Sequence, residues 1–157
     1  MNREEILNNL KEKFKGSIKD FLDKSPKRVY VEIDPKDIKC VVSYLFMDLG
    51  ARFNIASGIH TRPCFEILYH FSFDNLSLII SFRVKLDKDN PSIDSITPII
   101  KGAEWIEREM YELLGINFVG HPNLKRLLLP DEWPQGVHPL RTDYKEWDKN
   151  AIRDRGV

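Results

Sequence analysis

Two neighbouring segments of this sequence, residues 64–73 and 78–86, place an apolar side chain at every second position. A period of two is typical of β-strands that bury one face and expose the other. Asp74 and Asn75 lie between the segments and are a turn signal, so we expect an antiparallel hairpin. One face of this hairpin is wholly apolar and needs a cover of helices, which constrains the fold more than any other feature.

The rest of the chain supplies that cover and further strands. Helical spacing of apolar residues predicts helices at 3–22, 36–49 and 103–114, and alternation predicts strands at 28–33 and 51–59. In the strand at 51–59, the side chains expected to face the core are Ala51, Phe53, Ile55 and Ile59. Pro26, Pro35 and Gly115 mark helix boundaries. The sequence therefore predicts an α+β fold: a two-layer sandwich of a mostly antiparallel sheet with helices on one face, followed by an extended C-terminal arm.

Charge and hydropathy limit what this chain is expected to bind directly. Lys+Arg and Asp+Glu number 24 each, so no overall field attracts nucleic acid or an anionic membrane. The longest apolar runs fall far short of the roughly eighteen residues of a membrane-spanning helix. The N-terminus is charged and lacks the apolar region of a signal peptide. We therefore expect any membrane attachment to pass through partner proteins.

The segment that follows the last predicted helix is the least regular part of the sequence. Four prolines and two glycines fall between Gly120 and Pro139, which forbids a continuous helix or a central strand. The segment also contains Trp, Leu and Val, which disordered chains lack. We interpret it as an ordered arm whose apolar side chains need a surface, part of it on another subunit. The expected division is a scaffold domain at 1–118 and a partner-binding arm and tail at 119–157.

Four histidines raise the question of metal chemistry. His121 and His138 lie in proline-flanked turns of the arm, and with Cys64 or a carboxylate they would supply metal ligands. Their spacing matches no standard zinc pattern, so we expect each imidazole to hydrogen-bond backbone carbonyls instead. His60 and His70 are expected to be surface or rim residues.

Other chemical signatures are missing from the sequence. Glu107 and Glu109 stand two apart on a helix and point in different directions, which disfavours a pair of catalytic carboxylates. There is no GxSxG, P-loop or dinucleotide motif. Cys40 and Cys64 fall short of the four thiolates that an iron–sulfur cluster requires. We therefore expect no catalytic, cofactor-binding or metal-binding residue in this chain.

One ordered pattern of about forty residues is far more specific than these single motifs. It consists of Glu107, Arg108, Glu109, Gly115, Gly120, His121, Pro122, Arg126, His138, Pro139, Leu140, Arg141 and Asp143. The pattern resembles the signature of the 30-kDa subunit of respiratory complex I and of its relatives in energy-converting hydrogenases. A weaker, colinear resemblance extends over residues 29–102. Glu112 stands where the family pattern has Asp, which keeps the charge.

The resemblance implies an accessory subunit that does no chemistry of its own. Such a subunit belongs to the cytoplasmic arm of a complex I-like or energy-converting hydrogenase-type membrane redox complex. It braces the hydrogenase-like large subunit and the iron–sulfur small subunit during electron transfer. Iron–sulfur clusters, and nickel–iron or quinone, would reside in those partners, and the chain would lie at the cytoplasmic face of the cell membrane through its complex. The thirteen signature residues would form the partner interface, with Arg108 in a partly buried ion-pair network that holds the arm.

Two other functions stay open. A stand-alone, metal-dependent small enzyme would use His121, His138 and nearby carboxylates, and tightly bound zinc or iron in the pure chain would reveal it. A nucleic-acid or adaptor module would use the sheet, and recovery of nucleic acid with the chain would reveal that.

Overall fold

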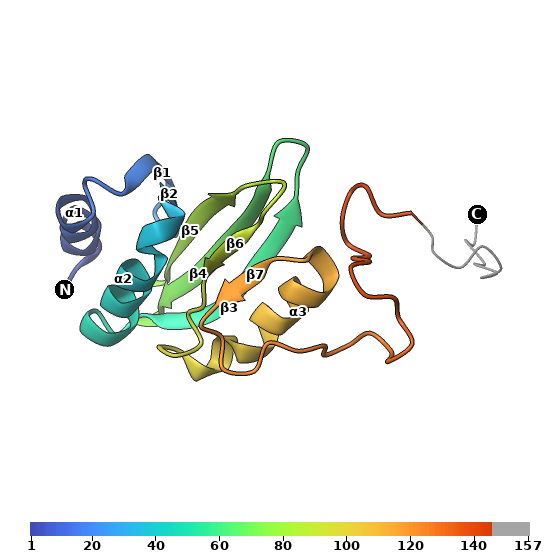
Figure 1. The fold of residues 1–157 in the computed structure, drawn as a ribbon. Coiled ribbons are helices and arrows are strands. Elements are labelled where there is room, and N and C mark those ends of the chain that lie inside the picture. The colour runs from blue at the N-terminus through green and yellow to red at the C-terminus, as the bar shows by residue number, and fades with distance from the viewer. Residues whose placement is uncertain (146–157) are drawn as a thin grey trace, which may run out of the picture.

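The computed structural model describes residues 1–145, which form a five-stranded sheet with helices on one side and an arm beyond them (Figure 1). The strands stand in the order β1-β2-β5-β4-β3, with β2 and β5 parallel and every other pair antiparallel. The strands of this sheet are β1 (Ile18–Ser25), β2 (Arg28–Ile33), β3 (Arg52–His60), β4 (Phe65–Phe73) and β5 (Leu78–Leu86). The expected α+β sandwich with a mostly antiparallel sheet is confirmed.

The hairpin of β4 and β5 forms the centre of the sheet, as its alternating sequence predicts. The two strands pair in unbroken antiparallel register from Phe65 opposite Leu86 to Phe73 opposite Leu78. A short 3₁₀ turn, Asp74–Leu76, joins them. The alternating apolar residues, from Phe65 to Phe73 and from Leu78 to Leu86, face the same side and are buried there, while Leu68 and Ile79 lie on the other face and are partly buried. This face is the floor of the hydrophobic core.

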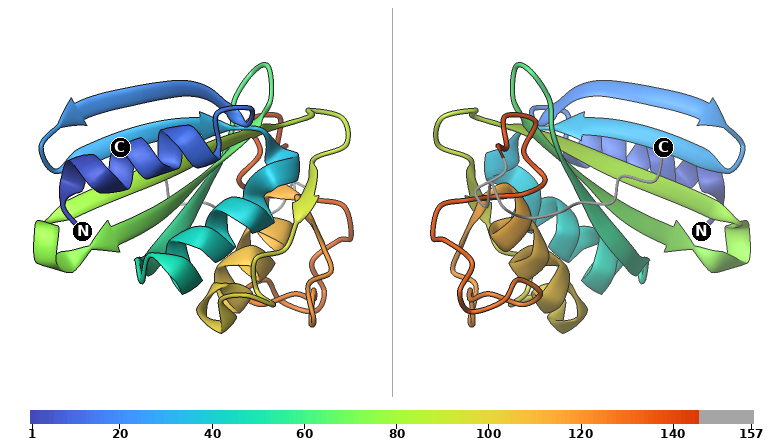
Figure 2. Two further views of the ribbon diagram at one scale, coloured as in Figure 1. Left: turned by 90° about the vertical axis from the view of Figure 1, so that its left-hand side faces the viewer. Right: turned by 90° about the vertical axis from the view of Figure 1, so that its right-hand side faces the viewer.

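Three helices cover that floor (Figure 2). They are α1 (Arg3–Lys13), α2 (Ile38–Ser43) and α3 (Glu104–Leu114). A 3₁₀ turn, Pro35–Asp37, precedes α2, and a π-helical turn, Tyr44–Asp48, continues it, so the helix predicted at 36–49 is present in three parts. Asn2 begins α1 with a capping box, and Gly115 ends α3 in the left-handed conformation.

The prediction of one helix over 3–22 is wrong beyond Lys13, because the chain turns there and returns as β1. Ile18 and Phe21 are three residues apart, which resembles helical spacing. The register of β1 against β2 shifts twice, between Ile18 and Asp20 and between Asp23 and Ser25. These irregularities remove the period of two that would have revealed a strand.

The predicted faces of β3 are also wrong beyond Phe53. The register against β4 shifts between Phe53 and Ile55, so the strand changes phase. Ile55 and Ile59 are therefore exposed, while His60, expected at the surface or rim, is buried. A bulge of one residue explains all of these differences.

A second, two-stranded sheet carries the chain to the arm. Its parallel strands are β6 (Ser92–Asp94) and β7 (Asn117–Val119), which lie on either side of α3 in the sequence. A 3₁₀ turn, Lys101–Ala103, leads directly into α3. Val119, the first residue of the predicted arm, still belongs to β7, and the arm described by the structure, residues 120–145, then runs along α3 and past its end (Figure 1).

Candidate functional site

α3 positions most of the signature residues, because its polar side chains reach three different segments. The first is the connector that follows β6. Glu107 is fully buried, and its carboxylate accepts hydrogen bonds from the hydroxyls of Ser95 and Thr97 and from the N–H of Ile96 at 2.7 Å. A buried carboxylate is stable only with such partners. Glu107 therefore fixes the connector against the helix.

His121 fixes the start of the arm next to this carboxylate. Its Nδ1 accepts a hydrogen bond from the N–H of Asn123 at 3.0 Å, so the proton resides on Nε2. Nε2 donates to the carbonyl of Glu104 at 3.1 Å and lies 3.8 Å from the Glu107 carboxylate. Nearby, the Tyr69 hydroxyl is buried without a hydrogen-bond partner among residues 1–145. Burial, reinforced by the charge of Glu107, raises the pKa of Tyr69 well above its ordinary value, so the phenol stays neutral.

A second face of α3 binds the middle of the arm through peptide groups. Arg108 donates from Nε and Nη2 to the carbonyls of Lys125 and Arg126. One turn later on the same face, the Glu112 carboxylate accepts from three consecutive N–H groups at 2.7–3.1 Å, those of Leu127, Leu128 and Leu129. Five successive residues of the arm are thus held by two side chains of one helix.

The expected ion-pair network around Arg108 is therefore wrong. Among the described residues, its guanidinium hydrogen-bonds carbonyl oxygens and pairs with no glutamate. The reason is geometric: the arm turns two successive carbonyls, those of Lys125 and Arg126, toward Arg108. It then bends at residues 127–129 and turns three successive N–H groups toward Glu112, so that peptide groups satisfy both charges.

The third segment binds the end of α3, where a helix leaves its last carbonyls without internal partners. His138 Nδ1 donates to the carbonyl of Glu112 at 2.8 Å, and the N–H of Leu140 donates to that of Leu113 at 3.0 Å. Arg141 Nε donates to the carbonyl of Leu114 at 2.7 Å, which also places a cation at the negative end of the helix dipole. We call these three bonds the helix-end contacts.

Gly115 makes the helix-end contacts possible. Its φ of +76° is a conformation that other residues adopt only with strain. A Cβ at this position would lie 2.5 Å from Arg141 Nη2 and 2.6 Å from His138 Nε2. Glycine therefore serves here both to end the helix and to admit the arm.

The far end of the described arm contacts the sheet. The Arg141 guanidinium lies 5.1 Å from the ring centre of Phe65, and the His60 ring stacks on Phe65 at 4.2 Å. His60 Nδ1 accepts from the N–H of Thr142 at 3.1 Å. Within the arm, Trp133 Nε1 donates to the carbonyl of Val137 at 2.9 Å. The arm is thus an ordered segment through residue 145.

The structure brings many of the predicted residues together, although not all of them. Gly115, His138, Leu140 and Arg141 meet at the C-terminal end of α3, and Pro139 lies between two of the contacts. Arg108 contacts the arm separately, at the carbonyls of Lys125 and Arg126. Glu107 and His121 meet near its start. Apart from these groups, Arg126 donates to the carbonyls of Pro130 and Asp131, Gly120 takes a positive φ at a turn, and Pro122, Glu109 and Asp143 lie at the surface or partly exposed.

Sequence reasoning missed four residues that complete these contacts. Glu112 departs from the family pattern, and its spacing of four from Arg108 suggests an ion pair along the helix, not a contact with the arm. Ser95 and Thr97 belong to the weaker, colinear part of the family resemblance, which assigned them no role. His60 was misplaced with the rest of β3.

Neither arm histidine is placed to share a metal with the other. His121 and His138 bind the carbonyls of Glu104 and Glu112, which are eight residues, or roughly 12 Å, apart along the helix. Within residues 1–145, no three His, Cys, Asp or Glu side chains are grouped in a way that would hold a metal ion. The expectation that each imidazole hydrogen-bonds a carbonyl is confirmed.

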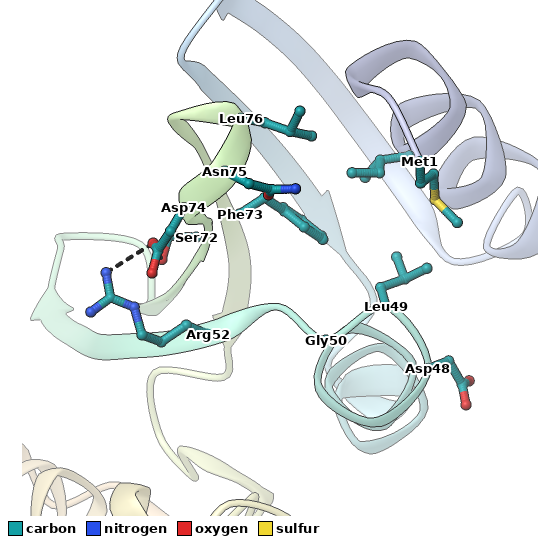
Figure 3. A pocket seen from close by; sticks show the side chains of 11 residues that line it. Met1, Asp48, Leu49, Gly50, Arg52, Ser72, Phe73, Asp74, Asn75 and Leu76 are labelled. Atoms are coloured by element: carbon teal, nitrogen blue, oxygen red, sulfur yellow. Dashed lines mark hydrogen bonds and ion pairs between the residues drawn. The ribbon is translucent and has the colours of Figure 1, made fainter.

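A pocket lies beside the contacts between α3 and the arm, and another lies away from them. A pocket of about 640 Å³ lies between α3 and the arm, and its polar groups, Glu112 and His138, already hydrogen-bond peptide groups. Another, of about 430 Å³, opens between α1 and the edge of the sheet, away from the arm (Figure 3). There Arg52 pairs with Asp74 at 2.9 Å, and hydrogen bonds from Ser72 and Arg52 lower the pKa of Asp74. In each pocket charged groups, Glu112 in the first and Arg52 and Asp74 in the second, are engaged in structural contacts.

Comparison with known proteins identifies the family of this chain. The family model described as respiratory-chain NADH dehydrogenase, 30 Kd subunit, matches residues 31–150. A subunit of the F(420)H(2) dehydrogenase of Methanosarcina mazei is 33% identical over 98% of this chain and 99% of its own length. Hydrogenase-4 component G of Escherichia coli is 30% identical over 92% of this chain, which spans only 27% of that protein.

A solved structure shares the fold. A chain of the membrane-bound sulfane sulfur reductase, an archaeal respiratory membrane complex, superposes with a TM-score of 0.77 over 96% of both chains at 16% identity. No helix within residues 1–145 has the length and apolar character needed to cross a membrane. The resemblance carried by the signature residues is confirmed, and the chain belongs to the family of the 30-kDa subunit of the respiratory-chain NADH dehydrogenase.

Proposed function

We propose that this chain is a non-catalytic subunit of a complex I-like or hydrogenase-type membrane redox complex, on its cytoplasmic side. It braces a hydrogenase-like large subunit and an iron–sulfur small subunit, so that their redox groups keep a fixed separation during electron transfer. The clusters, and any nickel–iron or quinone site, belong to those partners.

The observation that carries the proposal is how the arm is held. Its anchors join α3 and the sheet to the arm's backbone, or to arm side chains that turn inward. Large apolar side chains are left facing outward: Leu128 is 62% exposed, Leu140 58%, and Trp105 on α3 itself 68%. Exposed apolar side chains on a rigid backbone are typical of protein interfaces.

The way the arm is held affects the free energy of binding a partner. A segment that orders only on binding loses conformational entropy at that moment, which weakens the complex. Here hydrogen bonds to Arg108, Glu112 and the end of α3 hold the arm in the free chain. The arm is therefore preorganised, as a brace between two partners needs to be.

An affinity-tagged copy of this chain, purified from its host in mild detergent, tests the proposal. We expect it to carry a large hydrogenase-like subunit and an iron–sulfur protein, and to carry redox activity only while both are present. Tightly bound metal and substrate turnover by the chain alone, stripped of partners, would overturn the proposal. Nucleic acid in place of these proteins would also overturn it.

A variant of His138 tests whether the chain contributes to assembly of the complex and not to its redox activity. His138→Ala removes one helix-end contact and should lower the yield of assembled complex several-fold. The activity per assembled complex should stay unchanged, because the redox groups lie elsewhere. Normal yield with reduced specific activity would contradict the proposal. Lys88→Ala, at an exposed position in the loop after β5, is the control and should change neither quantity.

A further inference from the structure

The two edges of the main sheet differ in a way that concerns binding. Edge strands present unpaired backbone groups, and proteins protect them with charges and bulges. β1 has two register shifts and distributes charged residues, Lys19, Asp20, Asp23 and Lys24, along its length. β3 carries one Asp, Glu, Lys or Arg residue, Arg52 at its start, and runs in regular register from Ile55 to His60. β1 is therefore protected along its whole length, whereas the one bulge of β3 lies near its start and leaves Ile55 to His60 unprotected.

The outer backbone edge of β3 has no hydrogen-bond partner in residues 1–145. β3 pairs with β4 on one side, and apart from this pairing no backbone group of residues 52–59 is hydrogen-bonded to another described segment. Two of its apolar side chains, Ile55 and Ile59, are half exposed. An open, regular and apolar edge is a template for a further strand.

A groove runs beside this edge and has the form that such a strand requires. It encloses about 270 Å³ between β3 and α3, with an apolar lining that includes Ile106, Leu113 and Leu140. Gly58 brings the two elements close together, since a Cβ there would lie 2.8 Å from Leu114 Cδ1 and from Met110 Sδ. The groove therefore lies directly under one face of any strand added to β3.

Glu109 supplies the charge at this groove. Its side chain lines the groove, is partly exposed, and makes no hydrogen bond or ion pair within the described residues. It is the signature residue of α3 that the contacts with the arm do not use. A basic side chain on the incoming strand would satisfy it.

We propose that the edge of β3 at Ile55–Ile59 binds an extended segment of a partner polypeptide, which adds a sixth strand to the sheet. The segment carries apolar residues at alternate positions, packed beside Ile55 and Ile59 on one face and into the groove on the other. A Lys or Arg on the groove side pairs with Glu109. About five residues, roughly 17 Å of strand, span the site. The site is continuous with Leu140, so the proposal rests on the function proposed above and names one mode of partner contact.

Hydrogen exchange in the intact complex tests the pairing directly. Amides of residues 52–59 that face away from β4 should exchange at least tenfold more slowly in the purified complex than in the isolated chain. The amides of β1 serve as the internal control and should exchange equally in both. Unchanged exchange along β3 in a complex that still contains its partners overturns this inference and leaves the proposed function standing. Failure to recover any redox partner instead overturns the proposed function.

Two matched variants sharpen the test. Leu22 on β1 and Ile55 on β3 are about equally exposed, at 52% and 50%, so Ile55→Lys and Leu22→Lys should leave the fold of the isolated chain equally intact. Ile55→Lys should lower the yield of complex about tenfold, and Leu22→Lys should not change it. Glu109→Lys should lower the yield, and Glu109→Gln less so. Equal yields for Ile55→Lys and Leu22→Lys would contradict the proposal. It would also be contradicted if the isolated chain formed a dimer that Ile55→Lys dissociates, because the edge would then bind a second copy of this chain.

Discussion

The scaffold and the arm of this protein are held by different forces. The scaffold buries the apolar faces of β2, β4 and β5 under three helices, and thirty apolar residues are buried in its core. The arm buries little and is held by hydrogen bonds to the side chains of α3, to the end of that helix and to the sheet. Apolar burial is cooperative across a domain, whereas hydrogen bonds of this kind act locally. The comparison teaches that damage to the scaffold should unfold everything, and damage to the arm's anchors should release only the arm.

The largest expected effect is in the scaffold. Phe82→Ala, on the central strand β5, removes a side chain that is almost fully buried and leaves a cavity. We expect the free energy of unfolding to fall by about 3–5 kcal/mol. Denaturant titration should show one transition in which scaffold and arm signals are lost together. Separate transitions for the two regions would contradict the idea of a cooperative core.

The next effect should be confined to the arm. Glu112→Ala deprives three consecutive N–H groups of their acceptor, at a cost of about 1–3 kcal/mol. Limited proteolysis should cut near residues 125–129 about tenfold faster, because cleavage follows the population of the released arm. Hydrogen exchange in β4 should stay unchanged. The control is Glu109→Ala on the same helix, which should leave the cleavage rate as it is.

A smaller effect is expected at the end of α3. Gly115→Ala forces a side chain into a positive φ and against Arg141 and His138, at a cost of about 1–2 kcal/mol. Cleavage near Trp133 should increase while the melting of α3 changes little. Gly120 also has a positive φ but open space around its Cα, so Gly120→Ala should cost less. Equal effects of the two substitutions would show that backbone strain, not the helix-end contacts, determines the loss.

The smallest expected effect is an unchanged or slightly increased free energy of unfolding, in contrast to the losses above. Tyr69→Phe removes a buried hydroxyl that has no partner within residues 1–145, and we expect stability to be unchanged or to rise by up to about 1 kcal/mol. Because the pKa of Tyr69 is raised in the folded state, stability linked to its protonation is fully present below about pH 10 and is lost as the pH rises from there through the folded-state pKa. The variant should therefore lose less stability than the parent above that pH. Identical pH profiles would contradict a buried, neutral phenol.

The sequence predicted the middle of the sheet better than its edges. β2 and β5 were placed with the bounds that the structure has, and β4 within one residue, because an uninterrupted period of two reports burial directly. β1 and half of β3 were misjudged, because bulges near Ile18 and Phe53 change the phase of the pattern. A bulge depends on pairing with a distant strand, and a local pattern does not contain that information.

The same limit applies to the site. The sequence singled out Arg108, Gly115 and His138. Gly115 and His138 meet at the end of α3, and Arg108 contacts the arm from the middle of that helix. The sequence predicted a backbone carbonyl as the partner of His138 but not as the partner of Arg108, because every residue carries peptide groups and only the path of the backbone decides which of them are near. The sequence shows which residues are charged, so it suggested ion pairs for Arg108. In the structure, Arg108 instead hydrogen-bonds two backbone carbonyls.

The helix-end contacts have a consequence for the order in which this protein is built. The carbonyls of Glu112, Leu113 and Leu114 converge at one place only once α3 has coiled. A chain still emerging from the ribosome, or one that has misfolded, does not display the outward leucines in their final places. Partner subunits that bind these leucines, as proposed above, would therefore bind the folded chain in preference to an unfolded one.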